Sequence, residues 1–167
     1  MKKIILFTII ASLIFSISGC TSAESLPERM PEDFSFYVEW DYPGSSYDSA
    51  TGILRKKSGE KYVTAYMMSD EELKTVYELI RDMNPESYGD WIGNGLEYQE
   101  ADPCMDICLT VREGNTLITI EAKDAAGLSS GKSMRAKRYF ETVSKIVDIL
   151  MSTEEWKALP PDPGMYE

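Results

Sequence analysis

Apolar residues recur along this chain with two different periods, and the order of the two periods constrains the fold more than any other feature. Every second residue is apolar in residues 34–41, which is the pattern of a strand with one buried face. Short turns at Ser58–Gly59 and Gly114–Asn115 lie between similar segments and indicate two hairpins. The strands expected from these signals cover residues 34–41, 49–57, 61–68, 105–111 and 117–122. In the second hairpin, a two-residue turn would pair Val111 with Ile118 and place apolar side chains on one face.

Helical periodicity separates and follows these strands. Residues 69–83 and 136–150 repeat apolar side chains three and four positions apart, and a short third helix is expected at 154–159. Ser69 and Glu72 have the spacing of a capping box at the start of the first helix. The fold class that follows is α+β: a two-layer sandwich with a mostly antiparallel sheet of about five strands, in the order βββαββα, and two main helices on one face.

The alternation also predicts which side chains face away from the helices. The side chains expected toward the helices are Phe34, Phe36, Val38, Val63, Ala65, Ile107 and Leu109. Those expected on the open face are Tyr37, Tyr62, Tyr66, Thr64, Thr110 and Thr119. Tyrosines on a rigid sheet offer a large amphipathic surface to a sugar or a protein, so the three tyrosines form a candidate binding face. The alternative is that Tyr and Thr are simply common on solvated strands.

The first twenty residues have the three parts of an export signal. Lys2 and Lys3 precede an apolar run from Ile4 to Ile17, and small residues follow. This run is shorter than the ~20 residues needed to span a bilayer. Residues 17–20, Ile-Ser-Gly-Cys, resemble the lipobox of bacterial lipoproteins. The resemblance implies that the leader is cleaved after residue 19 and that Cys20 carries a diacylglyceryl anchor. A plain secretory signal or an uncleaved short anchor is the alternative.

The rest of the chain divides into a tether, one domain and a tail. Residues 20–33 contain two prolines and few apolar residues and are expected to form a lipidated tether. A single domain is expected at 34–159, and a proline-rich tail at 160–167. Residues 86–103 are expected to form a long loop anchored by Trp91 or Ile92.

Composition excludes several kinds of chemistry. The chain has 17 basic and 28 acidic residues, no histidine, and a formal charge of −11, which becomes −13 when the two leader lysines are removed. Histidine-based triads and imidazole metal sites are therefore excluded, and nucleic acid is an unfavourable partner. The acidic runs around Asp41 and Asp102 lack the ligand pattern of a calcium loop, so no metal and no cofactor is expected.

Two further cysteines follow the anchor position. Cys104 and Cys108 suggest a disulfide in an exported domain, but in one strand their α-carbons would be ~13 Å apart, beyond the reach of the bond. A bridge would need a turn or bulge near Pro103, and two unpaired thiols on the polar face of the strand are the alternative.

A broader resemblance covers most of the mature chain. Residues 46–49 (Ser-Tyr-Asp-Ser), 68–73 (Met-Ser-Asp-Glu-Glu-Leu) and 155–160 (Glu-Trp-Lys-Ala-Leu-Pro), with Gly164 and Tyr166, are similar to small lipoproteins of low-GC Gram-positive bacteria that have no assigned activity. This resemblance implies a location on the outer face of the cytoplasmic membrane and no catalytic residue.

Three functions remain open at this point. The first is a non-catalytic acidic domain, held to the membrane through Cys20, that binds a cationic protein or another surface ligand. The second is an inhibitor or immunity-type factor that blocks a basic envelope-targeting enzyme with an acidic loop at residues 97–106. The third is a hydrolase that uses two carboxylates, whose separation the sequence does not give.

Overall fold

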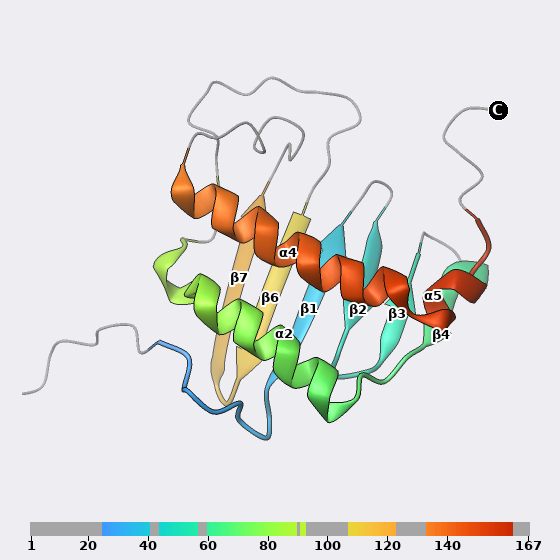
Figure 1. The fold of residues 1–167 in the computed structure, drawn as a ribbon, viewed down its shortest axis with the longest axis horizontal. Helices are drawn as coiled ribbons and strands as arrows, with labels where there is room; N and C mark the ends of the chain where they lie inside the picture. The colour runs from blue at the N-terminus through green and yellow to red at the C-terminus, as the bar shows by residue number, and fades with distance from the viewer. Residues whose placement is uncertain are drawn as a thin grey trace, which may run out of the picture.

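The computed structural model in Figure 1 describes residues 25–40, 44–56, 60–89, 91–92, 107–122 and 133–161. Helices α2 (Asp70–Met83) and α4 (Met134–Ser152) lie side by side across one face of a single sheet. A short helix, α5 (Glu154–Ala158), follows α4 near the β4 edge of the sheet. The predicted two-layer α+β sandwich is confirmed.

The sheet has the strand order β4-β3-β2-β1-β6-β7-β5. Six strands pair antiparallel with their neighbours, and the two-residue strand β5 pairs parallel with β7. The strands are β1 (Ser35–Trp40), β2 (Ser45–Asp48), β3 (Ile53–Arg55), β4 (Val63–Ala65), β5 (Trp91–Ile92), β6 (Ile107–Glu113) and β7 (Thr116–Ala122). A mostly antiparallel sheet was expected, whereas the extra strands β2 and β5 were not.

The second predicted hairpin has the expected register. Val111 pairs with Ile118 and Leu109 with Ile120 across β6 and β7. Gly114, at φ +55°, occupies the left-handed position that this tight turn requires. Turn chemistry and the buried apolar face agree here, so the local sequence determines the pairing.

The first predicted hairpin is wrong in two respects. Residues 49–52 form a turn, with Gly52 at φ +66°, so the expected strand 49–57 shortens to β3 and a new strand, β2, precedes the turn. On β4, Thr64 pairs with the fully buried Leu54, so Thr64 faces the helices while Val63 and Ala65 face away from them. The predicted faces of β4 are therefore inverted. In a three-residue edge strand, the hydrogen-bonded pairing with β3 determines which side chains face the helices, because the hydrophobic pattern is too short to outweigh it.

Helix α2 begins and ends where the sequence predicts. The Ser69 hydroxyl accepts a hydrogen bond from the Glu72 amide, and the Glu72 carboxylate accepts one from the Ser69 amide at 2.9 Å. Asn84 closes the helix in the left-handed conformation at φ 61°. Pro85 then opens a short 3-10 helix, η2 (Pro85–Ser87).

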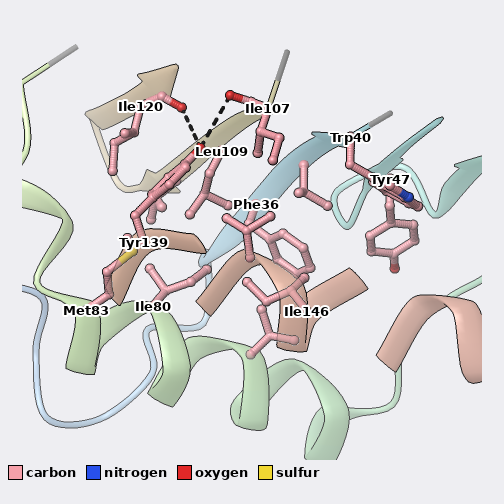
Figure 2. Close-up of a cluster of buried hydrophobic side chains, with 14 of the residues drawn as sticks. Phe36, Trp40, Tyr47, Ile80, Met83, Ile107, Leu109, Ile120, Tyr139 and Ile146 are labelled. Atoms are coloured by element: carbon pink, nitrogen blue, oxygen red, sulfur yellow. Dashed lines mark hydrogen bonds between the residues drawn. The ribbon is translucent and has the colours of Figure 1, made fainter. Parts of the chain in front are cut away.

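The core lies between the helices and the sheet, and Figure 2 shows its centre. The largest fully buried side chains come from all the main elements: Tyr47, Tyr77, Tyr139, Phe36, Leu54, Ile80, Met83, Leu109, Ile120, Ile146, Leu150 and Val38. Tyr139 of α4 reaches across the core, and its hydroxyl donates to the Ile120 carbonyl at 3.0 Å. This hydrogen bond joins the helix layer to the backbone of the sheet.

The segment before β1 belongs to the folded domain. Leu26 is only 6% exposed, and its amide donates to the Glu86 carboxylate at 2.8 Å. Further along, the Tyr77 hydroxyl donates to the Pro27 carbonyl, and Arg81 Nη1 donates to the Glu28 carbonyl at 2.8 Å. Residues 26–29 are therefore bound along α2 and η2, and Asp33 accepts the Gly114 amide of the β6–β7 turn at 3.0 Å, so the expected boundary at residue 34 is too late. Towards the other end of the described residues, helix α5 ends at Ala158 and Leu159 is buried.

Candidate functional site

The face of the sheet turned away from the helices is the candidate site. Strand alternation sends every second side chain to this face, and the strand registers align these side chains in rows across the sheet. The Tyr37 row contains Ala65, Ile53, Asp48, Tyr37, Thr110 and Thr119. The Cys108 row, beside it, contains Val63, Arg55, Ser46, Glu39, Cys108 and Glu121.

The three predicted tyrosines do not share this face. Tyr37 lies on it, in the centre of the sheet. Tyr62 is 7% exposed and belongs to a 3-10 helix, η1 (Glu60–Tyr62). Tyr66 lies on the helix side, where its ring centroid is 5.8 Å from that of the buried Tyr47. The predicted tyrosine face is therefore wrong for Tyr62 and Tyr66, because β4 has the opposite orientation to the one expected.

Tyr66 is instead part of the contact between the sheet and α2. Its hydroxyl donates to Glu72 at 2.8 Å. Burial and this carboxylate both raise the pKa of the Tyr66 phenol. A side chain held in this way links the sheet to α2, and it is only partly exposed.

Tyr37 is held in one orientation by its neighbour on the same strand. The Tyr37 hydroxyl donates to Glu39 Oε2 at 2.7 Å. Burial, together with this carboxylate, raises the pKa of Tyr37 to about 12. At neutral pH the phenol is therefore a hydrogen-bond donor, and its ring is a fixed surface in the middle of the sheet.

Cys108 lies between two carboxylates. Its strand partners are Glu39 on β1 and Glu121 on β7. The thiol is free and half-buried, and burial raises its pKa, with Glu121 and Glu39 adding to the effect. A thiol in this setting stays protonated at neutral pH and is a poor nucleophile. The unpaired thiol on the polar strand face was one of the two alternatives; Cys104 lies outside the described residues.

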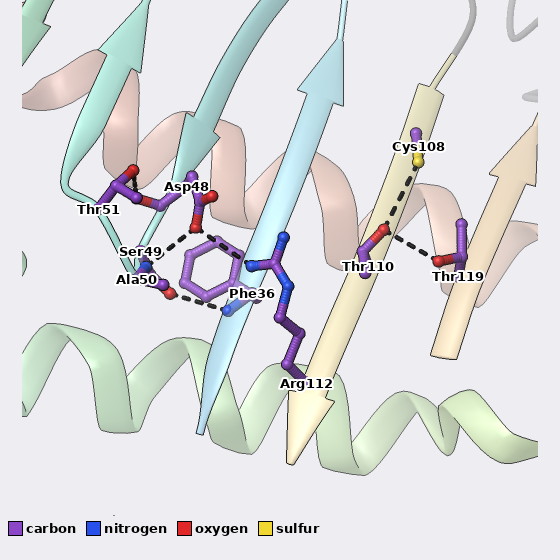
Figure 3. A network of polar contacts seen from close by, with 9 residues as sticks. All are labelled: Phe36, Asp48, Ser49, Ala50, Thr51, Cys108, Thr110, Arg112 and Thr119. Atoms are coloured by element: carbon purple, nitrogen blue, oxygen red, sulfur yellow. Dashed lines mark hydrogen bonds and ion pairs between the residues drawn. The ribbon is translucent and has the colours of Figure 1, made fainter. Parts of the chain in front are cut away.

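A polar ladder continues from this thiol across the sheet, as Figure 3 shows. Cys108 Sγ is 3.9 Å from the Thr110 hydroxyl, which is 3.1 Å from the Thr119 hydroxyl on β7. These contacts satisfy the hydroxyls within the sheet. Thr110 is only 9% exposed, so it offers little surface to a partner.

The second polar cluster in Figure 3 contains an ion pair, so its positive and negative charges neutralise each other. Arg112 Nη1 of β6 donates to Asp48 Oδ1 of β2 at 3.2 Å. The same carboxylate oxygen accepts the Ala50 amide at 3.0 Å and so fixes the turn after β2. Among the described residues, Glu39 and Glu121 take part in no such ion pair; the cation in their row is Arg55, two strands from Glu39 on the side away from Cys108.

Several predicted features fall on residues that the structure does not describe. These are the leader, Cys20, Asp41, most of the 86–103 loop, and the acidic loop at 97–106. Within the described part of the chain, no group of three or more potential ligands is placed to hold a metal ion. The described helices include none long and apolar enough to cross a bilayer.

Comparisons with known proteins add no relative. No family model, curated protein or solved structure matched this chain. The geometry of the open face, with Glu39 and Glu121 on either side of Cys108, is therefore the basis for assigning a function. The Cys108–Glu121 pairing was implicit in the hairpin register, whereas the contact with Glu39 was hidden, since it joins strands about seventy positions apart.

Proposed function

We propose that this chain is a bacterial lipoprotein, anchored through Cys20 on the outer face of the cytoplasmic membrane, whose acidic domain binds a cationic protein through the open sheet face. The anchor is supported by the lipobox-like residues 17–20 and the basic, apolar and small-residue segments before them. Two acyl chains on one glyceryl group hold a protein durably at a bilayer, so no spanning helix is required.

The observation that carries the binding role is the pair of carboxylates beside Cys108. Glu39 and Glu121 are separated by one strand, so their α-carbons are roughly 10 Å apart. One lysine or arginine side chain fits between carboxylates at this spacing. Because both acids stand on paired strands, their backbone is already ordered, and only side-chain conformational entropy is lost when a cation binds.

Tyr37 completes the surface next to the acids. Its ring is fixed by the Glu39 hydrogen bond, so it offers apolar area without the cost of ordering a mobile side chain. A charged contact beside a rigid aromatic ring is a common arrangement at protein interfaces. The formal charge of the mature chain, −13, favours encounter with a basic partner.

The anchor is tested by mass spectrometry of the protein purified from membranes. The expected result is a diacylglyceryl adduct on Cys20 and no residue before it, and Cys20→Ser should release the chain from the membrane fraction. An unmodified Cys20 or a retained leader would refute the anchor.

The binding face is tested by affinity capture from envelope extracts of the source cells. The variant Glu39→Gln/Glu121→Gln removes two charges from the face, and Glu71→Gln/Glu78→Gln removes two exposed charges from α2 as a matched control. We expect the first variant to lose the captured cationic protein, the control to keep it, and added salt to weaken capture. Equal capture by both variants would refute the assignment of the face. Inhibition of a captured envelope-degrading enzyme would assign the inhibitor role instead.

A further inference from the structure

The docking of residues 26–33 against the domain changes what an anchor at Cys20 would do. Leu26 is already buried, so only six peptide units separate it from Cys20. Fully extended, they span about 21 Å. The region of the domain around Leu26 would therefore stay close to the lipid headgroups, and its surface chemistry matters.

A chain of contacts leads from Leu26 to the beginning of α4. Leu26 is bound to Glu86 of η2, two residues before Tyr88. The Tyr88 hydroxyl donates to the Arg135 carbonyl at 2.8 Å, and the Arg135 guanidinium lies 4.6 Å from the centre of the Tyr88 ring. In Figure 1 the chain enters at the end of the sandwich where α2 ends and α4 begins. The start of α4 thus lies at the same end of the sandwich as the entering chain.

This surface is basic in a strongly acidic protein. Arg135, Lys137 and Arg138 are all exposed and are three of the 17 basic residues of the whole chain. Met134 beside them is 79% exposed, the most exposed of the large apolar side chains in the described residues. Helix α4 has no acidic residue in its first turn, whereas α2 has three. Cations at a helix start oppose the helix dipole, so their position here is not explained by the stability of the helix.

The acids close to this surface are partly engaged. Lys137 is 3.8 Å from Glu141, an exposed pair that water screens. Glu86 accepts the Leu26 amide, and Asp82 is paired with Arg81 at 3.0 Å. Arg135 and Arg138 have no carboxylate partner among the ion pairs of the described residues.

We propose that the basic patch formed by Met134, Arg135, Lys137 and Arg138 contacts the anionic phospholipid headgroups of the membrane to which the chain is anchored. This inference rests on the proposed anchor. Three cations close to an anionic surface are attracted to it, and the exposed Met134 can enter the interface. The domain would then stand with the α4 start toward the bilayer, leaving the open sheet face accessible from the side.

In the test, the anchor is attached chemically. The orientation of the domain on the membrane is then measured independently of natural acylation. Mature chain (residues 20–167) carrying Cys104→Ser and Cys108→Ser is coupled through Cys20 to a maleimide lipid in vesicles. One set of vesicles is phosphatidylcholine, and the other contains phosphatidylglycerol. Amine labelling with an N-hydroxysuccinimide ester, measured by mass spectrometry, compares Lys137 in the patch with Lys157 in α5.

We expect Lys137 to be labelled at least threefold more slowly on the anionic vesicles, and Lys157 to be unchanged. The variant Arg135→Gln/Arg138→Gln should lose this protection, whereas Lys61→Gln/Lys74→Gln, with the same charge change at exposed sites elsewhere, should keep it. Circular dichroism of each variant verifies folding.

Equal labelling of Lys137 on both kinds of vesicle, or equal protection of Lys137 and Lys157, would overturn the proposal. Protection that persists in the Arg135/Arg138 variant would also overturn it. An unmodified Cys20 in the native protein would refute the anchor itself. The vesicle result would then describe only the orientation of the chemically coupled protein.

Discussion

Replacing Leu26 by alanine tests whether the segment before β1 is part of the domain. The substitution removes three carbon atoms from a side chain that is 6% exposed. At ~0.8 kcal/mol for each buried methylene, the docked segment loses about 2.4 kcal/mol. This lies within the usual 2–5 kcal/mol range for buried leucine-to-alanine changes. Since 1.4 kcal/mol is a factor of ten, the docking equilibrium should shift about fiftyfold toward the released segment.

Trypsin provides a direct assay, because Arg29 lies within the docked segment. When opening and closing are fast, cleavage follows the population of the open form, so cleavage after Arg29 should accelerate about fiftyfold in Leu26→Ala. Leu117→Ala is the matched control: the same substitution at a leucine that is 65% exposed. Cleavage of Leu26→Ala at the rate of the native protein would refute the docking energetics.

Release of this segment would also change the reach of the anchor. With residues 26–33 undocked, the tether grows from about 21 Å to roughly 45 Å at full extension. The patch at the start of α4 would then no longer be confined to the headgroup region. Leu26→Ala should therefore reduce the protection of Lys137 on anionic vesicles in proportion to the released fraction, which cleavage after Arg29 measures, although residue 26 lies outside the patch.

Three further predictions concern the packed elements. Tyr139→Phe removes the hydrogen bond from the phenol to the Ile120 carbonyl and should lower the free energy of unfolding by about 0.5–1.5 kcal/mol; a urea midpoint equal to that of the native protein would contradict this. Ser69→Ala removes the cap of α2 and should cost about 1 kcal/mol at pH 7. The hydrogen bonds from Ser69 lower the pKa of Glu72, so they stabilise the folded state fully above the unfolded pKa of ~4.3. This stabilisation is lost as the pH falls through the lower folded pKa. An undiminished effect of Ser69→Ala at pH 2 would argue against the linkage. Because burial raises the pKa of Cys108, its reaction with a soluble maleimide at pH 7 should be at least tenfold slower in the native protein than in urea, and equal rates would disprove the protected thiol.

Much of the fold could be predicted because its signals are local. The capping box of α2 depends on residues three apart, and the β6–β7 register depends on one two-residue turn and the alternation on each side of it. In both cases the interacting residues are neighbours in the chain. The interactions that select the structure can therefore be recognised within a short stretch of sequence. The layer arrangement follows, since two amphipathic helices and an amphipathic sheet must cover one another.

The candidate site was less accessible from the sequence. Tyr37 was placed correctly because β1 is long and alternates strictly, with every second residue buried. Tyr62 and Tyr66 were placed on the wrong side because tyrosine suits either face and β4 has only three residues. The pairing of β1 with β6, which brings Glu39 beside Cys108, joins distant parts of the chain that carry no local signal for each other.

By itself, the sequence determined the helices, the β6–β7 hairpin and the two-layer class, because periodicity, caps and turns act over a few residues. Only the tertiary structure decided the face of β4, the docking of Leu26 against η2 and the clustering of acids around Cys108. These outcomes depend on which surfaces remain available after the core has formed. A short segment can keep its preferred backbone conformation on more than one of these surfaces, so its local sequence does not select between them.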